Sequence, residues 1–150
     1  LDDGGYDAII LAVAGLKRLG LKERIAQVIP HSVMLPAIAQ GAIGIETRFG
    51  DQDTLQWIQH LKHAITEREL RCERTVLSGL SGNYHVPISG FCFEKRGKLH
   101  LEARIGDPDG TELLVAQQTG LLDEPEKLGK EVTNQLIKQG SAKILEEFRS

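Results

Sequence analysis

The sequence has few of the residues that would place it at once in a special class of protein. Only 2 of its 150 residues are cysteine, and only 5% are aromatic. The two cysteines, Cys72 and Cys92, stand 20 positions apart in the sequence and lack the spacing of a zinc site. Neither a disulfide framework nor a structural metal is therefore indicated. We expect both residues to be buried, reduced thiols.

An excess of one charge and long apolar runs are also lacking. The 18 basic and 21 acidic residues give a formal net charge of −3, and no run of Lys or Arg suits a phosphate backbone. The apolar run over residues 8–15 is about half as long as a bilayer span requires, and no signal-peptide pattern precedes it. We therefore expect neither nucleic acid nor a membrane as a partner, and a cytoplasmic location.

Residues 1–50 carry the pattern of an incomplete α/β fold. The chain begins with Leu1 in a predicted loop, which suggests a fragment. Apolar runs over residues 6–11 and 35–48 predict buried parallel strands. A helix between them would place on one face Leu16, Leu19, Ile25 and Ile29. Two strands do not complete such a sheet, so we expect the remaining strands upstream of Leu1.

From residue 51 the pattern changes to that of a small α+β domain. A first helix, over residues 51–64, can be capped by Asp51 or Asp53. A second helix is predicted to begin with a capping box over Thr66–Glu69 and to end near residue 80.

The next segment alternates with period two and predicts a three-stranded antiparallel meander. Turn residues stand at Lys95–Gly97 and Asp107–Gly110. One face of the middle strand would carry Leu99, Leu101, Ala103 and Ile105, and the other His100, Glu102 and Arg104. A helix from Pro125 to Gly140 and a last helix capped by Ser141 would cover one face. The predicted fold class is thus α/β pieces followed by an α+β domain whose three-stranded antiparallel sheet is covered by helices.

Several residue groups could carry chemistry, and each also has a plain structural interpretation. His60 and His63 stand three apart on a predicted helix, but that helix offers no third zinc ligand, so no metal site is predicted. Asp107–Gly110 begins like a calcium loop but lacks the later ligands, and a hairpin turn is favoured.

Two further groups of residues could also carry chemistry. The serines near Gly79 stand between a helix and a strand, whereas a nucleophile elbow requires a strand followed by a helix. A small basic group could meet a carboxylate-bearing ligand or only solvate a helix face, and it comprises Lys17, Arg18, Lys22 and Arg24.

Four stretches carry a resemblance to a known family. "DAIILAVAGLKRLGL", "LPAIAQGAIGIETR", "GNYHVPISGF" and "GDPDG" occur in the order and spacing of porphobilinogen deaminase, also called hydroxymethylbilane synthase. The chain resembles the family over essentially its whole length. The resemblance implies a three-domain enzyme with two α/β domains similar to periplasmic binding proteins. It would make residues 1–50 the end of domain two and the return strand of domain one, and residues 51–150 the α+β domain three.

The resemblance also implies an activity and a cofactor. The family is a transferase of tetrapyrrole and haem biosynthesis that joins four porphobilinogen units into hydroxymethylbilane with release of ammonia. Its dipyrromethane cofactor is held by a thioether to a cysteine in a motif resembling L-x-G-G-C-x-V-P. Here the motif reads L-S-G-N-Y-H-V-P over residues 80–87. The attachment position is therefore Tyr84, with Gly82 and Asn83 as neighbouring cofactor-binding residues.

The substitution at Tyr84 sets the functional expectations. A phenol has a pKa of about 10 and is a poorer nucleophile than a thiolate, and neither Cys72 nor Cys92 lies in the motif. The resemblance places the family's assisting aspartate and substrate-binding arginines on earlier domains. We therefore expect no catalytic residue and no activity in this chain alone. Its expected partners are the N-terminal domains of the same protein and porphobilinogen, in a monomer.

Three explanations of Tyr84 stay open on the sequence. The chain can come from an enzyme with a substituted or divergent cofactor site. It can instead be a non-catalytic domain that keeps the fold for a structural or partner-binding role. Tyr84 can also be a strand aromatic that packs beside Val86 and Ile88, which agrees with either of the others.

Overall fold

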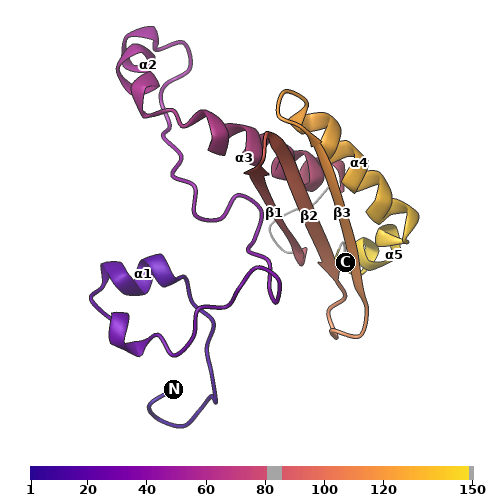
Figure 1. The fold of residues 1–150 in the computed structure, drawn as a ribbon. Coiled ribbons are helices and arrows are strands. Elements are labelled where there is room, and N and C mark those ends of the chain that lie inside the picture. Colours follow the sequence, from indigo (N-terminus) through magenta and orange to yellow (C-terminus); the bar gives the residue numbers. More distant parts are fainter. Residues whose placement is uncertain (81–85, 149–150) are drawn as a thin grey trace. The chain divides into compact units, whose positions relative to one another are not determined.

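The computed structural model describes residues 1–80 and 86–148 and divides the chain into two units, Leu1–Met34 and Leu35–Ser150 (Figure 1). The first unit contains the short helix α1 (Val13–Arg18) and the 3-10 turn η1 (Lys22–Arg24). α1 ends because Gly20 adopts a left-handed φ of 73°. The Leu21 N–H then bonds the Leu16 carbonyl at 2.8 Å, and the Gly20 N–H bonds that of Lys17 at 3.2 Å. This pair of bonds is a Schellman motif, so the predicted continuation of the helix to Ile29 is wrong.

The two strands predicted in residues 1–50 are also wrong for this structure. Residues 6–11 and 43–48 have no regular secondary structure, and residues 35–40 contribute a single β-bridge, between Ala37 and Ser89. A strand of a parallel sheet needs a neighbouring strand that pairs with its backbone N–H and C=O groups. Among the described residues no strand pairs with residues 6–11, the second run contacts β1 only around that bridge, and Ile43 is 93% exposed.

The helices that follow form where the spacing predicts them, although one begins differently. α2 (Gln52–Ile58), extended by the 3-10 turn η2 (Gln59–Leu61), is capped by Asp51, whose carboxylate accepts from the Thr54 N–H at 3.0 Å. α3 (Ala64–Gly79) begins before the predicted capping box at Thr66. His63 occupies its N-cap, and the Thr66 N–H bonds the His63 Nδ1 at 3.4 Å. Ala64, a strong helix former, can then serve as the first helical residue.

The predicted meander is confirmed as one antiparallel sheet in the order β1 (Ile88–Lys95), β2 (Lys98–Gly106), β3 (Leu113–Leu121). The β1–β2 turn has positive φ at both central residues, 54° at Arg96 and 74° at Gly97, which is the geometry of a two-residue type I′ hairpin. In the β2–β3 turn the Gly110 N–H bonds the Asp107 carbonyl at 3.2 Å, so Asp107–Gly110 forms the predicted hairpin turn.

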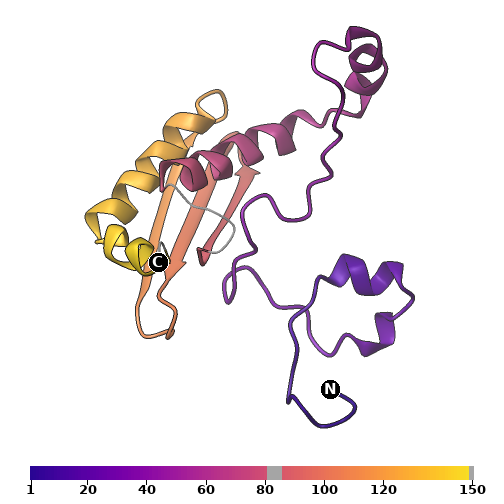
Figure 2. The same cartoon turned by 180° about the vertical axis from the view of Figure 1, so that it is seen from behind.

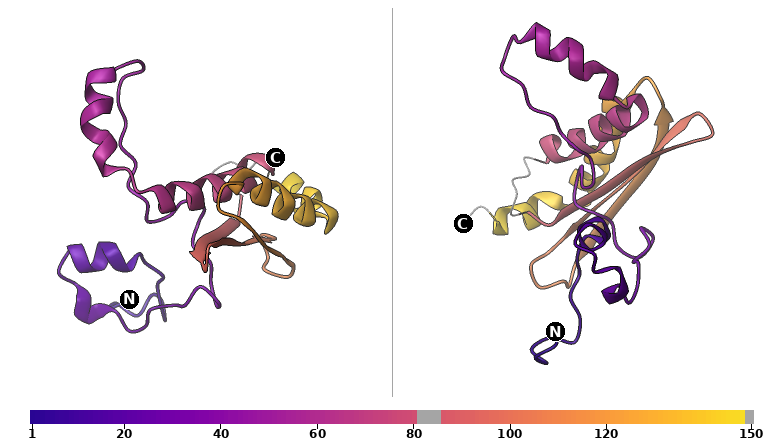
Figure 3. Two further views of the ribbon diagram at one scale, coloured as in Figure 1. Left: turned by 45° about the horizontal axis from the view of Figure 1, so that its top comes forward. Right: turned by 90° about the vertical axis from the view of Figure 1, so that its left-hand side faces the viewer.

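Three helices cover one face of the sheet, as Figure 2 shows from behind. α3 packs on β1, while α4 (Pro125–Lys138) packs on β3 and α5 (Ser141–Glu147) follows it (Figure 3). The α3–α4 crossing is close: a Cβ at Gly129 would lie 2.6 Å from the Cys72 carbonyl oxygen. Residues with at most 3% exposure in this core are Cys72, Val76, Leu80, Cys92, Leu99, Leu101, Ala103, Ile105, Ala116, Leu128, Val132, Leu136 and Ile144.

The start of α5 differs from the prediction. Gly140, with a left-handed φ of 98°, is the N-cap, and Ser141 is the first helical residue. The Ser141 hydroxyl is completely buried and has no hydrogen-bond partner among the described residues. Ser141 therefore does not cap the helix, because the left-handed Gly140 makes the turn one residue earlier.

Candidate functional site

The residues predicted to carry the site, Gly82, Asn83 and Tyr84, lie outside the described residues. The structure does describe both flanks of this segment. On the α3 side Leu80 is 3% exposed. On the β1 side Val86 packs against the core, and the Pro87 carbonyl accepts from the Gly106 N–H at 3.2 Å. The segment therefore connects two elements that are both fixed to the core of the α+β domain.

The two thiols of the chain meet in that core. Cys72 of α3 is fully buried, Cys92 of β1 is 2% exposed, and neither forms a disulfide. The Cys72 side chain hydrogen-bonds Cys92, and this bond, together with burial, raises the pKa of the Cys92 thiol far above its usual range. The expectation of buried, reduced thiols is confirmed. A reactive cysteine is a partly exposed thiolate. Both of these thiols are closed off from solvent, so neither residue is placed to replace the cysteine of the family motif.

A buried carboxylate that the sequence analysis missed lies beside these thiols. Glu73 of α3 is 5% exposed, and its two oxygens accept from the Cys92 N–H and the Ala39 N–H, both at 2.8 Å. Burial raises the pKa of Glu73, although both backbone bonds act in the opposite direction. The signal in the sequence was its helical spacing, because Glu73 lies three residues before Val76 and seven before Leu80, on the apolar stripe of α3.

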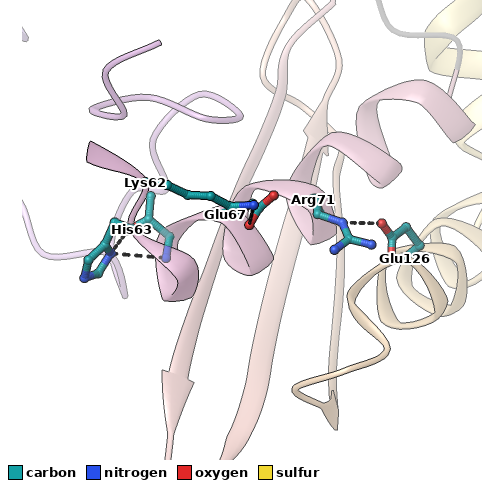
Figure 4. A network of polar contacts seen from close by, with 6 residues as sticks. Lys62, His63, Glu67, Arg71 and Glu126 are labelled. Carbon is teal, nitrogen blue, oxygen red and sulfur yellow. Dashed lines mark hydrogen bonds and ion pairs between the residues drawn. The ribbon is translucent and has the colours of Figure 1, made fainter. Parts of the chain in front are cut away.

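A series of polar contacts follows the outer surface of α3 (Figure 4). Lys62 pairs with Glu67 at 2.8 Å, and the His63 Nδ1 lies 2.8 Å from the Thr66 hydroxyl. Further along, the Arg71 Nε donates to Glu126 of α4 at 2.6 Å. His63 is thus used in capping α3. Over residues 1–80 and 86–148, no group of three His, Cys, Asp or Glu side chains is placed to hold a metal ion.

The other candidate groups have structural roles. The Asp107 carboxylate accepts from the Thr111 hydroxyl and the Glu112 N–H, and these bonds lower the pKa of Asp107. They stabilise the hairpin turn. In the first unit Arg24 pairs with Asp2 at 2.6 Å, and Lys17 and Arg18 stand in the last turn of α1, where cations favour the helix dipole.

A groove of 930 Å³ opens beside the start of α3. Its lining includes the apolar side chains of Ile43, Leu55 and Leu70 and the basic side chains of Arg71 and Arg74. Apart from residues 41–45, the lining comes from the segment that runs from the start of α2 to the middle of α3.

The described part of the chain contains no helix long and apolar enough to cross a membrane.

These features define a class: an α+β domain with a one-sided sheet, whose candidate site is the helix-to-strand connection between α3 and β1. Comparison with known proteins identifies it further. Residues 1–56 match the family model "Porphobilinogen deaminase, dipyromethane cofactor binding domain", and residues 67–138 match "Porphobilinogen deaminase, C-terminal domain". The chain belongs to the porphobilinogen deaminase family.

Curated relatives of the same family match nearly the whole chain. The chain is 41% identical over 152 residues to a porphobilinogen deaminase of Chlorobium luteolum, with 99% of the chain and 49% of the relative covered. It is 43% identical over 150 residues to one of Desulforudis audaxviator, with 100% of the chain and 48% of the relative covered. The chain thus spans about half the length of the curated relatives it matches.

Proposed function

We propose that this chain is part of a hydroxymethylbilane synthase, the transferase that joins four porphobilinogen units into hydroxymethylbilane with release of ammonia in tetrapyrrole and haem biosynthesis. The observation that carries the proposal is the succession of two porphobilinogen deaminase models along one chain, over residues 1–56 and 67–138. The identity of 41–43% to relatives of that name over nearly all of the chain supports it. A cytoplasmic, monomeric enzyme follows from the family resemblance.

The proposed partner is the N-terminal half of the same protein. The relatives extend about as far again beyond the matched part. Apolar side chains of the first unit, such as Ile9, Ile10 and Leu11, are 54–64% exposed, as expected for a surface that other strands cover. In this proposal, residues 1–50 complete α/β domains similar to periplasmic binding proteins. The 150 residues alone are inactive, since the porphobilinogen-binding arginines and the assisting aspartate belong to the other half.

The described residues do not fit thioether attachment of dipyrromethane. The only two thiols of the chain are buried at Cys72 and Cys92, and the position that matches the family cysteine is Tyr84. A phenol with a pKa of about 10 is largely protonated at neutral pH. We infer that cofactor loading on this chain is impaired at that position.

Restoring the thiol tests this inference. We expect Tyr84→Cys in the whole protein to acquire the mass of dipyrromethane and a colour with an aldehyde reagent for pyrroles, because a thiolate is the nucleophile that the attachment needs. Tyr84→Ser, which makes the same space without a thiol, is the matched control and should acquire neither. Loading of the serine variant would show that bulk, not the nucleophile, is what Tyr84 changes.

A non-catalytic domain of the same fold is the second candidate function. The replacement of the family cysteine by Tyr84 favours it, because a protein selected for structure or partner binding has no need of the thiol. The Tyr84→Cys variant separates the two. If it contains the N-terminal half with the family's arginines and aspartate and still fails to load, the non-catalytic role is supported.

We further propose that residues 51–150 fold independently, as the family's third domain, while residues 1–50 depend on the missing half. The hydrogen-bonded sheet and its covering helices support this division, because stable amides lie in such cores. Amide exchange on the 150-residue chain should show protection concentrated in the second part, and in the first part only where residues 35–40 contact β1 and Glu73. Equal protection in both parts would contradict the division.

A further inference from the structure

A short segment joins the α+β domain from outside its sheet. Residues 35–40, which we call the strap, run along β1. Leu35 is 7% exposed, and Ile38 packs against the core so closely that a Cβ at Gly90 would lie 2.5 Å from its Cδ1 atom. Ala37 forms an antiparallel bridge with Ser89. The strap therefore serves as a partial neighbour strand for β1.

The outer edge of β1 is completed by the strap and by two carboxylates of α3. Three alternate N–H groups of β1 that do not face β2 find acceptors there. The Gly90 N–H bonds the Pro36 carbonyl at 3.1 Å. The next two, at Cys92 and Glu94, bond the carboxylates of Glu73 at 2.8 Å and Glu69 at 2.9 Å. An unpaired strand edge leaves such donors unsatisfied and open to another chain, so these acceptors close it.

Glu73 also holds the strap. Its second oxygen accepts from the Ala39 N–H at 2.8 Å. Ala39 has a left-handed φ of 61°, a conformation that a residue with a Cβ keeps only when its surroundings impose it. One buried carboxylate thus bonds an amide of the strap and an amide of β1 at the same time. Among the described residues, Glu69, one helical turn earlier, accepts a backbone bond from β1 alone.

We propose that Glu73 is a positioning residue that ties the strap to β1 and so fixes the spacing of α3 and β1. These are the two elements between which the chain places Tyr84. The tie, by which we mean the two bonds from the Ala39 and Cys92 N–H groups to Glu73, is argued from the structure. Its consequence for cofactor loading rests on the function proposed above.

Amide exchange in the whole protein tests the tie without any activity. In Glu73→Gln one of the two acceptor oxygens becomes an NH2 group, which cannot accept from a backbone N–H. We expect exchange at Ala39 or Cys92, or at both, to be at least about tenfold faster, while α4 exchanges as before. Glu69→Gln is the matched control. The described bond of Glu69 is the one from the Glu94 N–H, and the amide oxygen of a glutamine can still accept it. Glu73→Asp keeps the charge but has a shorter side chain. We expect it to show the same loss of exchange protection at residues 39 and 92, and it replaces the glutamine variant if that variant does not fold.

The outcomes separate the proposals. Unchanged exchange at residues 39 and 92, or an equal increase in α4, would overturn the tie. In a Tyr84→Cys background we expect Glu73→Gln to slow the gain of dipyrromethane mass and Glu69→Gln to leave its rate unchanged. Equal loading rates in these two variants would overturn the positioning role. If the Tyr84→Cys parent itself does not load, the proposed function fails, and exchange still decides the tie.

Discussion

Similar apolar patterns have different outcomes in residues 1–34 and in residues 64–148. In α4, Leu128, Val132 and Leu136 are at most 1% exposed. In the first region, the run that includes Ile10 remains outside any element, and Ile10 is 64% exposed. The α4 stripe faces a sheet built by residues that precede it by only a few tens of positions. An apolar pattern therefore produces an element where the same chain supplies the surface that covers it.

Truncating one apolar side chain in each region gives the largest expected contrast. We expect Leu136→Ala to lower the free energy of unfolding by about 2–5 kcal/mol, because it leaves a cavity in a closed core. Ile10→Ala in the 150-residue chain should change it by less than about 0.5 kcal/mol, since its side chain is exposed. Denaturant unfolding followed by circular dichroism measures both. Comparable losses of unfolding free energy for the two variants in this chain would contradict the proposed difference between the regions. A larger loss for Ile10→Ala in the whole protein would support the proposal that the N-terminal half covers this surface.

Among the described residues, the buried core contains one unpaired polar group, and removing it should raise stability instead of lowering it. The Ser141 hydroxyl is buried with no partner among the described residues. Ser141→Ala removes the cost of that desolvated group, and we expect a gain of about 1 kcal/mol in unfolding free energy. Ser78, exposed near the end of α3, is the matched control, and Ser78→Ala should stay within about 0.5 kcal/mol of the parent. A loss of stability in Ser141→Ala would mean that the hydroxyl has a partner after all.

The smallest expected effect concerns a surface ion pair and depends on pH. The hydrogen bond from Arg71 lowers the pKa of Glu126. Its contribution is therefore present above the ordinary glutamate pKa of about 4.3 and is lost as the pH falls through the lower native value. Both side chains are about half exposed, so we expect Arg71→Gln to cost at most about 0.5 kcal/mol at pH 7 and less at pH 3. Thermal unfolding at the two pH values checks this, and a cost that grows on acidification would contradict the assignment.

Much of the α+β domain could be predicted from the sequence because its signals are local. Strict alternation through Leu99, Leu101 and Ala103, with turn residues on either side of β2, fixed both the strands and the covered face. The spacing of Leu128, Val132 and Leu136 similarly identified α4. In each case the pattern and the covering surface belong to the same hundred residues.

The errors arose where a local signal had a competitor. The capping box at Thr66 was wrong because His63 caps α3 and the Glu69 carboxylate bonds β1 instead. The long helix after residue 12 was wrong because Gly20 terminates it with a left-handed turn. Glu73 was missed because its two partners, Ala39 and Cys92, are distant in the sequence, and no local rule brings them together.

The candidate site could be located only through the family motif. Composition and spacing identify residues 80–87 as a helix-to-strand connection, and nothing in them predicts a thioether. The motif supplied the attachment position, Tyr84. The structure then added that Cys72 and Cys92 are buried where no cofactor can reach them.

The intact mass of the unaltered whole protein tests the central claim most directly. If Tyr84 stands where the family has its cysteine and no other thiol can take its place, the protein has the mass of its polypeptide alone. A mass increased by dipyrromethane, together with colour from an aldehyde reagent for pyrroles, would show that the cofactor is attached and would contradict the account.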